Sequence, residues 1–251
     1  YIYLVHGSLA VNLDLGALMR AHVKSGADVT AVCTPGTPKE THHRFVTDEN
    51  GRVTQLLFRR SGPGPGHAAL EAYIMSRDVL LDLLERCDSA MNRRFHRDGL
   101  GGLMEAGGTI NVYMHEGYAV NIDTVDGYYK ANMDMLEAKN RHELFPEDRP
   151  VHTKGRADVS TYYGDGAVVK NCLVADGCFI EGELENCVIF RGVRVEAGAV
   201  LKNCIIMQDS VIGAGAQLSN IISDKDVTVG AGVTLAGSPK LPLVVPKGSV
   251  L

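Results

Sequence analysis

Apolar residues in the C-terminal part of the chain recur at every sixth position. The large ones form two runs, which are Val168, Val174 and Ile180, then Val200, Ile206, Ile212 and Leu218. Four residues after each comes a second, mostly smaller side chain: Cys172, Cys178 and Leu184, then Cys204, Ser210, Ala216 and Ile222. A hexapeptide period with a large and a small inward position is typical of a triangular prism of short stacked strands. We therefore expect a left-handed parallel β-helix over residues 151–251 and interpret its cysteines as core thiols.

The residues before the repeat have the pattern of an α/β domain. Residues 2–5 and 29–33 read as strands, and the helix between them begins at Asp14 and ends at Gly26, which predicts a βαβ unit. Residues 48–52 carry a hairpin turn signal. Strands are expected at 70–75 and 109–114, and helices at 76–87 and 126–136. Residues 138–163 read as a polar connector containing Pro146 and Pro150, so we place the domain boundary near 150.

Composition excludes several classes of protein. The net charge is −5 and no long basic run occurs, which argues against nucleic acid as a partner. No apolar stretch approaches the roughly 20 residues of a membrane-spanning helix. The six cysteines include no C-x-x-C pair, which favours free thiols, a cytoplasmic setting and no structural zinc. The chain starts abruptly in a strand without a signal-peptide pattern, so we expect upstream residues to be missing.

Four segments that cover nearly the whole chain resemble one family. They read VNLDLGALMRAHVKSGADVT, GYAVNIDTVDGYYKANMDML, ELFPEDRPVHTK and VKNCLVADGCFIEGELENCVIFRGVRVEAGAVLKNCIIMQDSVIG. Together they resemble the glucose-1-phosphate adenylyltransferases (ADP-glucose pyrophosphorylases) of bacterial glycogen synthesis, and most of all the non-catalytic, regulatory-type subunit. The resemblance implies a partial Rossmann-like nucleotidyltransferase domain at 1–150, followed by the β-helix. The family's Gly-rich nucleotide loop has no counterpart here.

The resemblance also implies that the catalytic metal ligands are lost. Catalytic members carry one aspartate in a Gly-Asp-His-type turn, where this chain reads Val-His-Gly-Ser-Leu and has Ser8. They carry a second in a Gly-Tyr-Trp-Arg-Asp-type segment, where this chain has Asn121. A hydroxyl and an amide hold Mg²⁺ far more weakly than two carboxylates. We therefore expect no catalytic residues, metal or cofactor in this chain, and Mg²⁺ only in a catalytic partner.

Four residues fall in the family's sugar-phosphate region. Arg59 and Arg60 stand where catalytic members have a Glu-Lys-Pro segment, and their forked guanidinium groups suit phosphate, although a solvated basic loop is the alternative. Tyr73 stands in the segment that reads Ser-Met-Gly-Ile-Tyr in catalytic members, with a core aromatic as the alternative. Glu71 replaces the glycine of that segment, where it would fill the pocket and repel a phosphate.

Two lysines are the candidates for an effector site. Lys225 in SDKDVTVG and Lys247 in VVPKGSV fall where the family places lysines that contact phosphorylated metabolites. Solvated surface lysines are the alternative interpretation. Arg93, Arg94 and Arg97 form a further basic cluster, which we interpret as charges at a helix end.

Three functions follow as hypotheses. The first is a regulatory subunit that forms a homo- or hetero-tetramer with a catalytic glucose-1-phosphate adenylyltransferase subunit and modulates ADP-glucose synthesis from ATP and glucose 1-phosphate. The second is an active sugar-phosphate nucleotidyltransferase with rearranged ligands, in which Asp123 replaces a lost acid. The third is a hexapeptide acyltransferase, which is disfavoured because the general-base histidine is missing: all nine histidines lie at or before His152.

Overall fold

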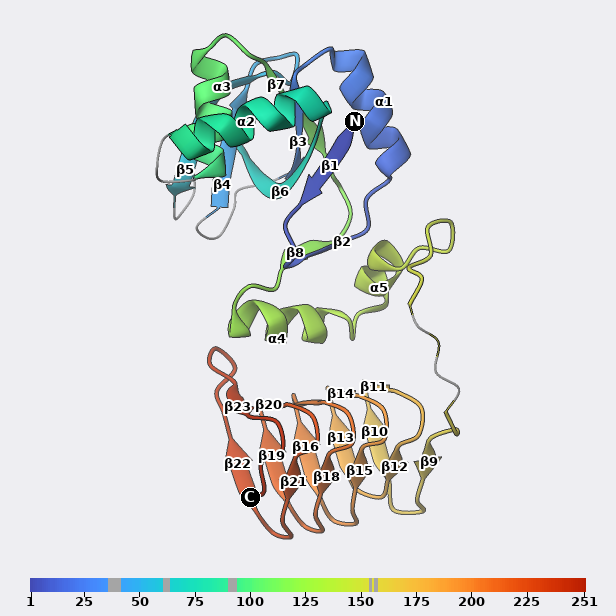
Figure 1. The fold of residues 1–251 in the computed structure, drawn as a ribbon. Helices are drawn as coiled ribbons and strands as arrows, with labels where there is room; N and C mark the ends of the chain where they lie inside the picture. The colour runs from blue at the N-terminus through green and yellow to red at the C-terminus, as the bar shows by residue number, and fades with distance from the viewer. Residues whose placement is uncertain (36–41, 61–63, 90–93, 154, 156–157) are drawn as a thin grey trace. The chain divides into compact units, whose positions relative to one another are not determined.

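The computed structural model describes residues 1–35, 42–60, 64–89, 94–153, 155 and 158–251 (Figure 1), without the side chains of 42, 59, 60 and 89. It divides into two compact units, Tyr1–Asn121 and Ile122–Leu251. Each unit is described by itself.

A six-stranded mixed sheet forms the centre of the first unit. Its main path runs β5 (Val53–Arg60), β4 (His42–Thr47), β6 (His67–Met75), β3 (Val29–Thr34) and β7 (Ile110–Met114), and β1 (Ile2–Val5) also pairs with β6. Both β1 and β3 run antiparallel to β6. The predicted βαβ unit is therefore present, with β6 inserted between its two parallel strands. The predicted hairpin joins β4 to β5.

Helices cover both faces of this sheet. The Asp14 side chain caps α1 (Leu15–Ser25) by accepting from the Ala17 amide at 2.8 Å, and Gly26 ends it with a φ of 60°. Leu18 of α1 packs on one face of the sheet. The other face packs against α2 (Arg77–Ser89), the π-helical segment η1 (Phe95–Gly101) and α3 (Gly102–Glu105).

The prediction of a polar connector at 138–163 is wrong for the first residues of this segment. Residues Ala138–Leu144 form a helix, α5, directly after α4 (Val125–Asp134). The Asn140 side chain donates to the Asp134 carbonyl at 2.9 Å, and Arg141 donates to the Met135 carbonyl at 2.6 Å. These polar residues satisfy carbonyls at the end of α4, a use that hydrophobic periodicity does not reveal.

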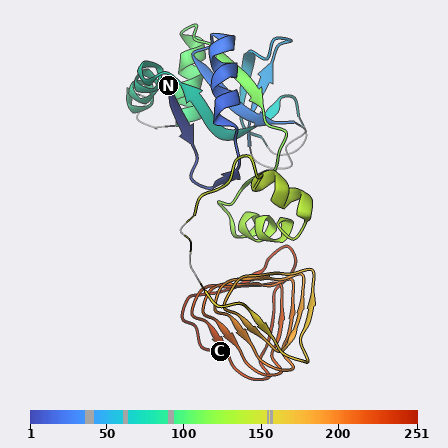
Figure 2. The ribbon, with the colours of Figure 1, turned by 90° about the vertical axis from the view of Figure 1, so that its right-hand side faces the viewer.

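The second unit contains the predicted left-handed β-helix. Three parallel sheets of five strands each surround its core, and the coils have a triangular outline in Figure 2. One sheet consists of β10 (Val168–Lys170), β13 (Glu183–Glu185), β16 (Val200–Lys202), β19 (Gln217–Ser219) and β22 (Thr234–Ala236). The second consists of β11 (Leu173–Val174), β14 (Val188–Ile189), β17 (Ile205–Ile206), β20 (Ile221–Ser223) and β23 (Leu243–Val245). The third consists of β9 (Tyr162–Tyr163), β12 (Phe179–Ile180), β15 (Arg194–Val195), β18 (Val211–Ile212) and β21 (Thr228–Val229).

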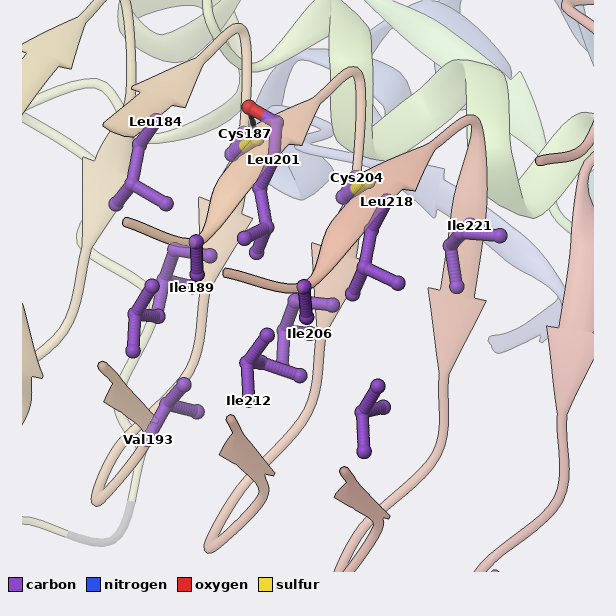
Figure 3. Close-up of a cluster of buried hydrophobic side chains, with 14 of the residues drawn as sticks. Leu184, Cys187, Ile189, Val193, Leu201, Cys204, Ile206, Ile212, Leu218 and Ile221 are labelled. Atoms are coloured by element: carbon purple, nitrogen blue, oxygen red, sulfur yellow. Dashed lines mark hydrogen bonds between the residues drawn. The ribbon is translucent and has the colours of Figure 1, made fainter. Parts of the chain in front are cut away.

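Like residues stack in rows along the inside of the β-helix. Leu184, Leu201 and Leu218 form one row, beside rows that contain Ile189 with Ile206 and Cys187 with Cys204 (Figure 3). The prediction that Val168 and Val200 point into the core is wrong. Val168 is 39% exposed and Leu201, not Val200, is buried. Equivalent residues in most successive coils lie 17 apart, and in one pair of coils 15 apart, rather than at a multiple of six, so a strict hexapeptide count loses register.

Most corners of the coils turn through residues with positive φ. One corner has asparagine at four successive levels, namely Asn171, Asn186, Asn203 and Asn220. Asparagine tolerates the left-handed region because its short polar side chain bonds locally. The Asn171 amide donates to Asn186 at 2.7 Å, and Asn186 donates to Asn203 at 3.3 Å. The other corners use glycine or aspartate, among them Gly198, Gly215, Gly232, Asp209 and Asp226.

Helix α4 covers one sheet of the β-helix. Tyr129 packs with Val188, Ile205 and Ile222, and its hydroxyl donates to the Asn203 carbonyl at 2.8 Å. Ile222, predicted as an inward position, is therefore buried under α4 on the outside of the prism. Because α4 packs on the β-helix, the second compact unit begins at Ile122, before this helix. The domain boundary near 150 stays a prediction.

All six cysteines are free thiols. Cys178 and Cys204 are fully buried and Cys172 packs against the same core, which confirms the interpretation as core thiols. Burial raises the pKa of Cys33 and of Cys178, so both stay protonated at neutral pH. Among the described residues, no helix combines the length and apolar character needed to cross a membrane.

The asparagine ladder gives a test of the coil geometry. We expect Asn186→Ala to lower the free energy of unfolding by about 1–3 kcal/mol, because it removes two side-chain bonds and places a Cβ-bearing residue without local bonding in the left-handed region. Asn186→Gly is the matched control. It loses the same bonds without the strain, so its free energy of unfolding should fall by less. Denaturant unfolding followed by circular dichroism measures both. Equal stability of the two variants would contradict this account of the corner.

Candidate functional site

Two short strands bring together the positions of the missing metal ligands. Strand β2 (Leu9–Val11) pairs antiparallel with β8 (Ala119–Asn121), and Leu9 lies opposite Asn121. Ser8 precedes β2 directly. Because paired residues in antiparallel strands are neighbours, this register places Ser8 beside Asn121 although 113 residues separate them in sequence.

A chain of hydrogen bonds joins three side chains here. The Ser8 hydroxyl donates to the Asn121 side-chain oxygen at 2.5 Å, and Nδ1 of His6 lies 2.7 Å from the same hydroxyl. A serine has one proton to donate. Since Asn121 receives it, His6 donates to the Ser8 oxygen from Nδ1. Ser8 and Asn121 are half-buried and His6 is exposed.

This neutral pair is stable without a cation. Two carboxylates about 4 Å apart in these positions would repel by roughly 1–4 kcal/mol unless a metal ion lay between them. A hydroxyl and an amide instead satisfy each other directly. The sequence motifs indicate Ser8 and Asn121 but not His6, whose one signal is its place two residues before Ser8 in the same turn.

A separate cavity of about 690 Å³ opens in the first unit. Its lining comes from β4, β5 and η1 and consists of His43, Phe58, Arg94, Phe95, His96 and Arg97. The imidazole rings of His43 and His96 stack with centroids 3.7 Å apart and planes 17° apart. The structure therefore places Arg94 and Arg97 of the predicted basic cluster beside two histidines at the start of a π-helix. Arg93 lies outside the described residues.

Tyr73 is a core residue with one polar contact. Its ring is 3% exposed and packs in the core on the α2 side of the sheet. Its hydroxyl lies 2.6 Å from Nε2 of the cavity residue His96. Burial, reinforced by Glu71, raises the pKa of Tyr73 well above its ordinary value, so the phenol stays neutral. Arg59 and Arg60 end β5, and their side chains are outside the described part of the structure.

Glu71 has an unusual backbone. Its φ is 53°, a conformation in which glycine is the ordinary residue. Strand β6 bulges here, because Ala31 pairs with Tyr73 while Cys33 pairs with Ala69. The Glu71 carbonyl accepts from the His6 amide at 3.0 Å. Its carboxylate and the rings of His43 and His96 offer ligand atoms that all lie within 4.8 Å of one another.

The two candidate effector lysines belong to the second unit and lie on neighbouring coils. The Gly248 amide, next to Lys247, donates to the Lys225 carbonyl at 3.0 Å. The Lys247 ammonium lies 3.4 Å from the Asp226 carboxylate, and the side chains are 64% and 52% exposed. The structure thus brings Lys225 and Lys247 to one corner, where Asp226 partly offsets their charge.

The strain at Glu71 is testable by a matched pair of variants. Both Glu71→Gly and Glu71→Ala remove the carboxylate, but only alanine keeps a Cβ in the left-handed region. We expect the glycine variant to be more stable than the alanine variant by about 1 kcal/mol. Thermal unfolding of the two proteins measures this difference. An alanine variant of equal or greater stability would show that the bulge tolerates a side chain without strain.

Comparison with known proteins gives these residues a context. Residues 159–240 match the family described as GlmU-like, C-terminal hexapeptide. The chain is 27% identical over 205 residues to a glucose-1-phosphate adenylyltransferase of Desulfitobacterium hafniense, covering 80% of this chain and 52% of the relative. A glucose-1-phosphate adenylyltransferase of Clostridium novyi is 24% identical over 207 residues, covering 80% of this chain and 54% of the relative.

A relative with another name is more similar over a shorter stretch. The glycogen biosynthesis protein GlgD of Bacillus subtilis is 39% identical over 137 residues, covering 53% of this chain and 38% of the relative. The chain thus spans about half the length, or less, of these curated relatives. The resemblance found in the sequence is confirmed: the chain is a homologue of glucose-1-phosphate adenylyltransferases and of the glycogen biosynthesis protein GlgD.

Proposed function

We propose that this chain is part of a regulatory subunit of glucose-1-phosphate adenylyltransferase that acts in glycogen biosynthesis. It forms a homo-tetramer or, with a catalytic subunit, a hetero-tetramer, and it modulates the synthesis of ADP-glucose from ATP and glucose 1-phosphate by that catalytic subunit. It does not hold the catalytic Mg²⁺ itself, which is bound only by the catalytic partner. The observation that carries this proposal is the hydrogen bond between Ser8 and Asn121.

The physical argument rests on what adenylyl transfer requires. The transferring phosphate develops charge that a divalent cation neutralises, and Mg²⁺ is commonly held by one or two carboxylates plus the substrate phosphates. The Ser8–Asn121 pair offers no formal negative charge, and its donor and acceptor already satisfy each other at 2.5 Å. Binding Mg²⁺ there would break a short bond without supplying charge in return. A subunit of this kind is suited to regulation rather than turnover.

The effector site of the proposal lies at the corner of Lys225 and Lys247. A phosphorylated metabolite suits this corner because two lysines from neighbouring coils meet there through their backbones, and a lysine is a good point charge for phosphate. Asp226 already pairs with Lys247. A phosphate would therefore bind in competition with an exposed ion pair, which contributes little to stability.

Restoring the acids tests the interpretation of the metal positions. We expect the double variant Ser8→Asp with Asn121→Asp to be less stable than the wild type by about 1–4 kcal/mol in the absence of divalent ions, because two carboxylates then face each other. Millimolar Mg²⁺ should recover its melting temperature, while the wild type should not respond. The double variant Ser8→Ala with Asn121→Ala is the control. A Ser8→Asp and Asn121→Asp protein insensitive to Mg²⁺ would refute the assignment of these positions.

Activity measurements test the regulatory role. The purified full-length protein should show no ADP-glucose synthesis alone with Mg²⁺, ATP and glucose 1-phosphate. Added to a catalytic glucose-1-phosphate adenylyltransferase subunit, it should co-elute with it and change its activation by sugar phosphates. A variant with Lys225→Gln and Lys247→Gln should co-elute but lose the change in activation. Robust metal-dependent turnover by the isolated protein would overturn the proposal and favour the alternative of rearranged ligands that include Asp123.

A further inference from the structure

We propose that His43, Glu71 and His96 form a binding site for a divalent transition-metal ion of the zinc class. The site lies in the first unit, at the wall of the cavity lined by β4, β5 and η1. It is separate from Ser8 and Asn121, so it neither uses nor restores the catalytic Mg²⁺ position.

The donor set determines the class of metal. Two imidazoles with one carboxylate suit Zn²⁺, Co²⁺, Ni²⁺ or Fe²⁺, whereas Mg²⁺ prefers oxygen ligands only. The three ligand atoms lie within 4.8 Å of one another, and all three side chains are half-buried. Because Zn–N bonds are about 2.0–2.1 Å long, two ligands of one ion lie no more than about 4 Å apart. Rotation of the side chains that moves the ligand atoms closer by about an ångström would therefore complete the site.

Contacts around the histidines keep them close to each other. The Tyr73 hydroxyl lies 2.6 Å from Nε2 of His96, so it can accept that proton and leave Nδ1 for a metal. Phe95 packs edge-on against the His96 ring, at 5.8 Å between centroids. The ring of His43 lies edge-on to Phe58 at 6.0 Å and stacks on His96. These contacts keep both imidazoles together at the cavity wall. Because the nitrogen lone pairs of stacked rings lie in nearly parallel planes, metal binding must turn one ring out of the stack.

Glu71 contributes the only anionic ligand at the cost of backbone strain. Its φ of 53° persists in a residue type that rarely adopts it. Strained residues of this kind concentrate at binding and catalytic sites, where the strain positions a functional group. The bulge in β6 points to such a use, because bulges re-aim side chains next to sites.

The cavity leaves room for a fourth ligand. A zinc ion with three protein ligands keeps one position open, and here that position would face a space of about 690 Å³. Arg94 and Arg97 line the same space. Their positive charge opposes a bare cation and favours an anion as the fourth ligand, so inorganic phosphate should strengthen metal binding rather than compete with it.

The test is direct metal binding to the protein without a polyhistidine tag. After treatment with a chelator, calorimetric titration with Zn²⁺ should show one site per chain, and Co²⁺ should give the visible absorption of a tetrahedral site. His43→Gln, His96→Gln and Glu71→Gly should each weaken Zn²⁺ binding by about tenfold or more. His142 is an exposed histidine on α5, so His142→Gln should leave Zn²⁺ binding unchanged.

The glycine variant keeps the experiment decisive. Glu71→Gly relieves the left-handed strain, so a loss of metal binding with unchanged or increased melting temperature assigns the carboxylate to the metal. The proposal is overturned if the wild type binds no stoichiometric Zn²⁺. It is also overturned if the three variants bind Zn²⁺ as tightly as His142→Gln does. Neither result bears on the Mg²⁺ test at Ser8 and Asn121, so the two proposals stand or fall separately.

Discussion

The register between successive coils is the constraint on which the second unit depends. Each strand bonds to the equivalent strand of the next coil, and Leu184, Leu201 and Leu218 stack only while that register holds. A slip of one residue would turn the inward row outward. Left-handed corners keep the register, and the asparagine ladder adds side-chain bonds between levels. The core, the corners and the cover supplied by α4 follow from one periodic geometry.

In the first unit, strand β6 has the corresponding role. It pairs with β1, β3 and β4, and it carries both Tyr73 and Glu71. Through the Glu71 carbonyl it holds the turn that contains His6, and through the Tyr73 hydroxyl it contacts His96. The turn with the neutral Ser8–Asn121 pair and the cavity with its histidines are therefore connected by a single bulged strand. A change in this bulge would affect both.

Much of this architecture was predictable from the sequence. The hexapeptide period indicated the β-helix, and Asp14 and Gly26 marked the ends of α1, because these signals are local. Leu201 escaped prediction because the 17-residue coil is not a multiple of six. The helix α5 and the π-helical η1 escaped because their residues are polar or rich in glycine. The cluster of His43, Glu71 and His96 forms because β4, β6 and η1 lie close together in the fold. Their spacing in the sequence does not predict this contact.

The lengths of the coils also limit how a β-helix of this kind can change. The asparagine corner advances by 15 residues between Asn171 and Asn186 but by 17 between Asn186 and Asn203. The shorter coil passes from Ile180 to Leu184 through Gly182, where the next coil passes from Val195 to Leu201 through the turn at Gly198. The inward rows continue unbroken past this difference. Insertions and deletions are thus absorbed at the corners, and the last coil gives a second case, because Ile221 pairs with Leu243, 22 residues later.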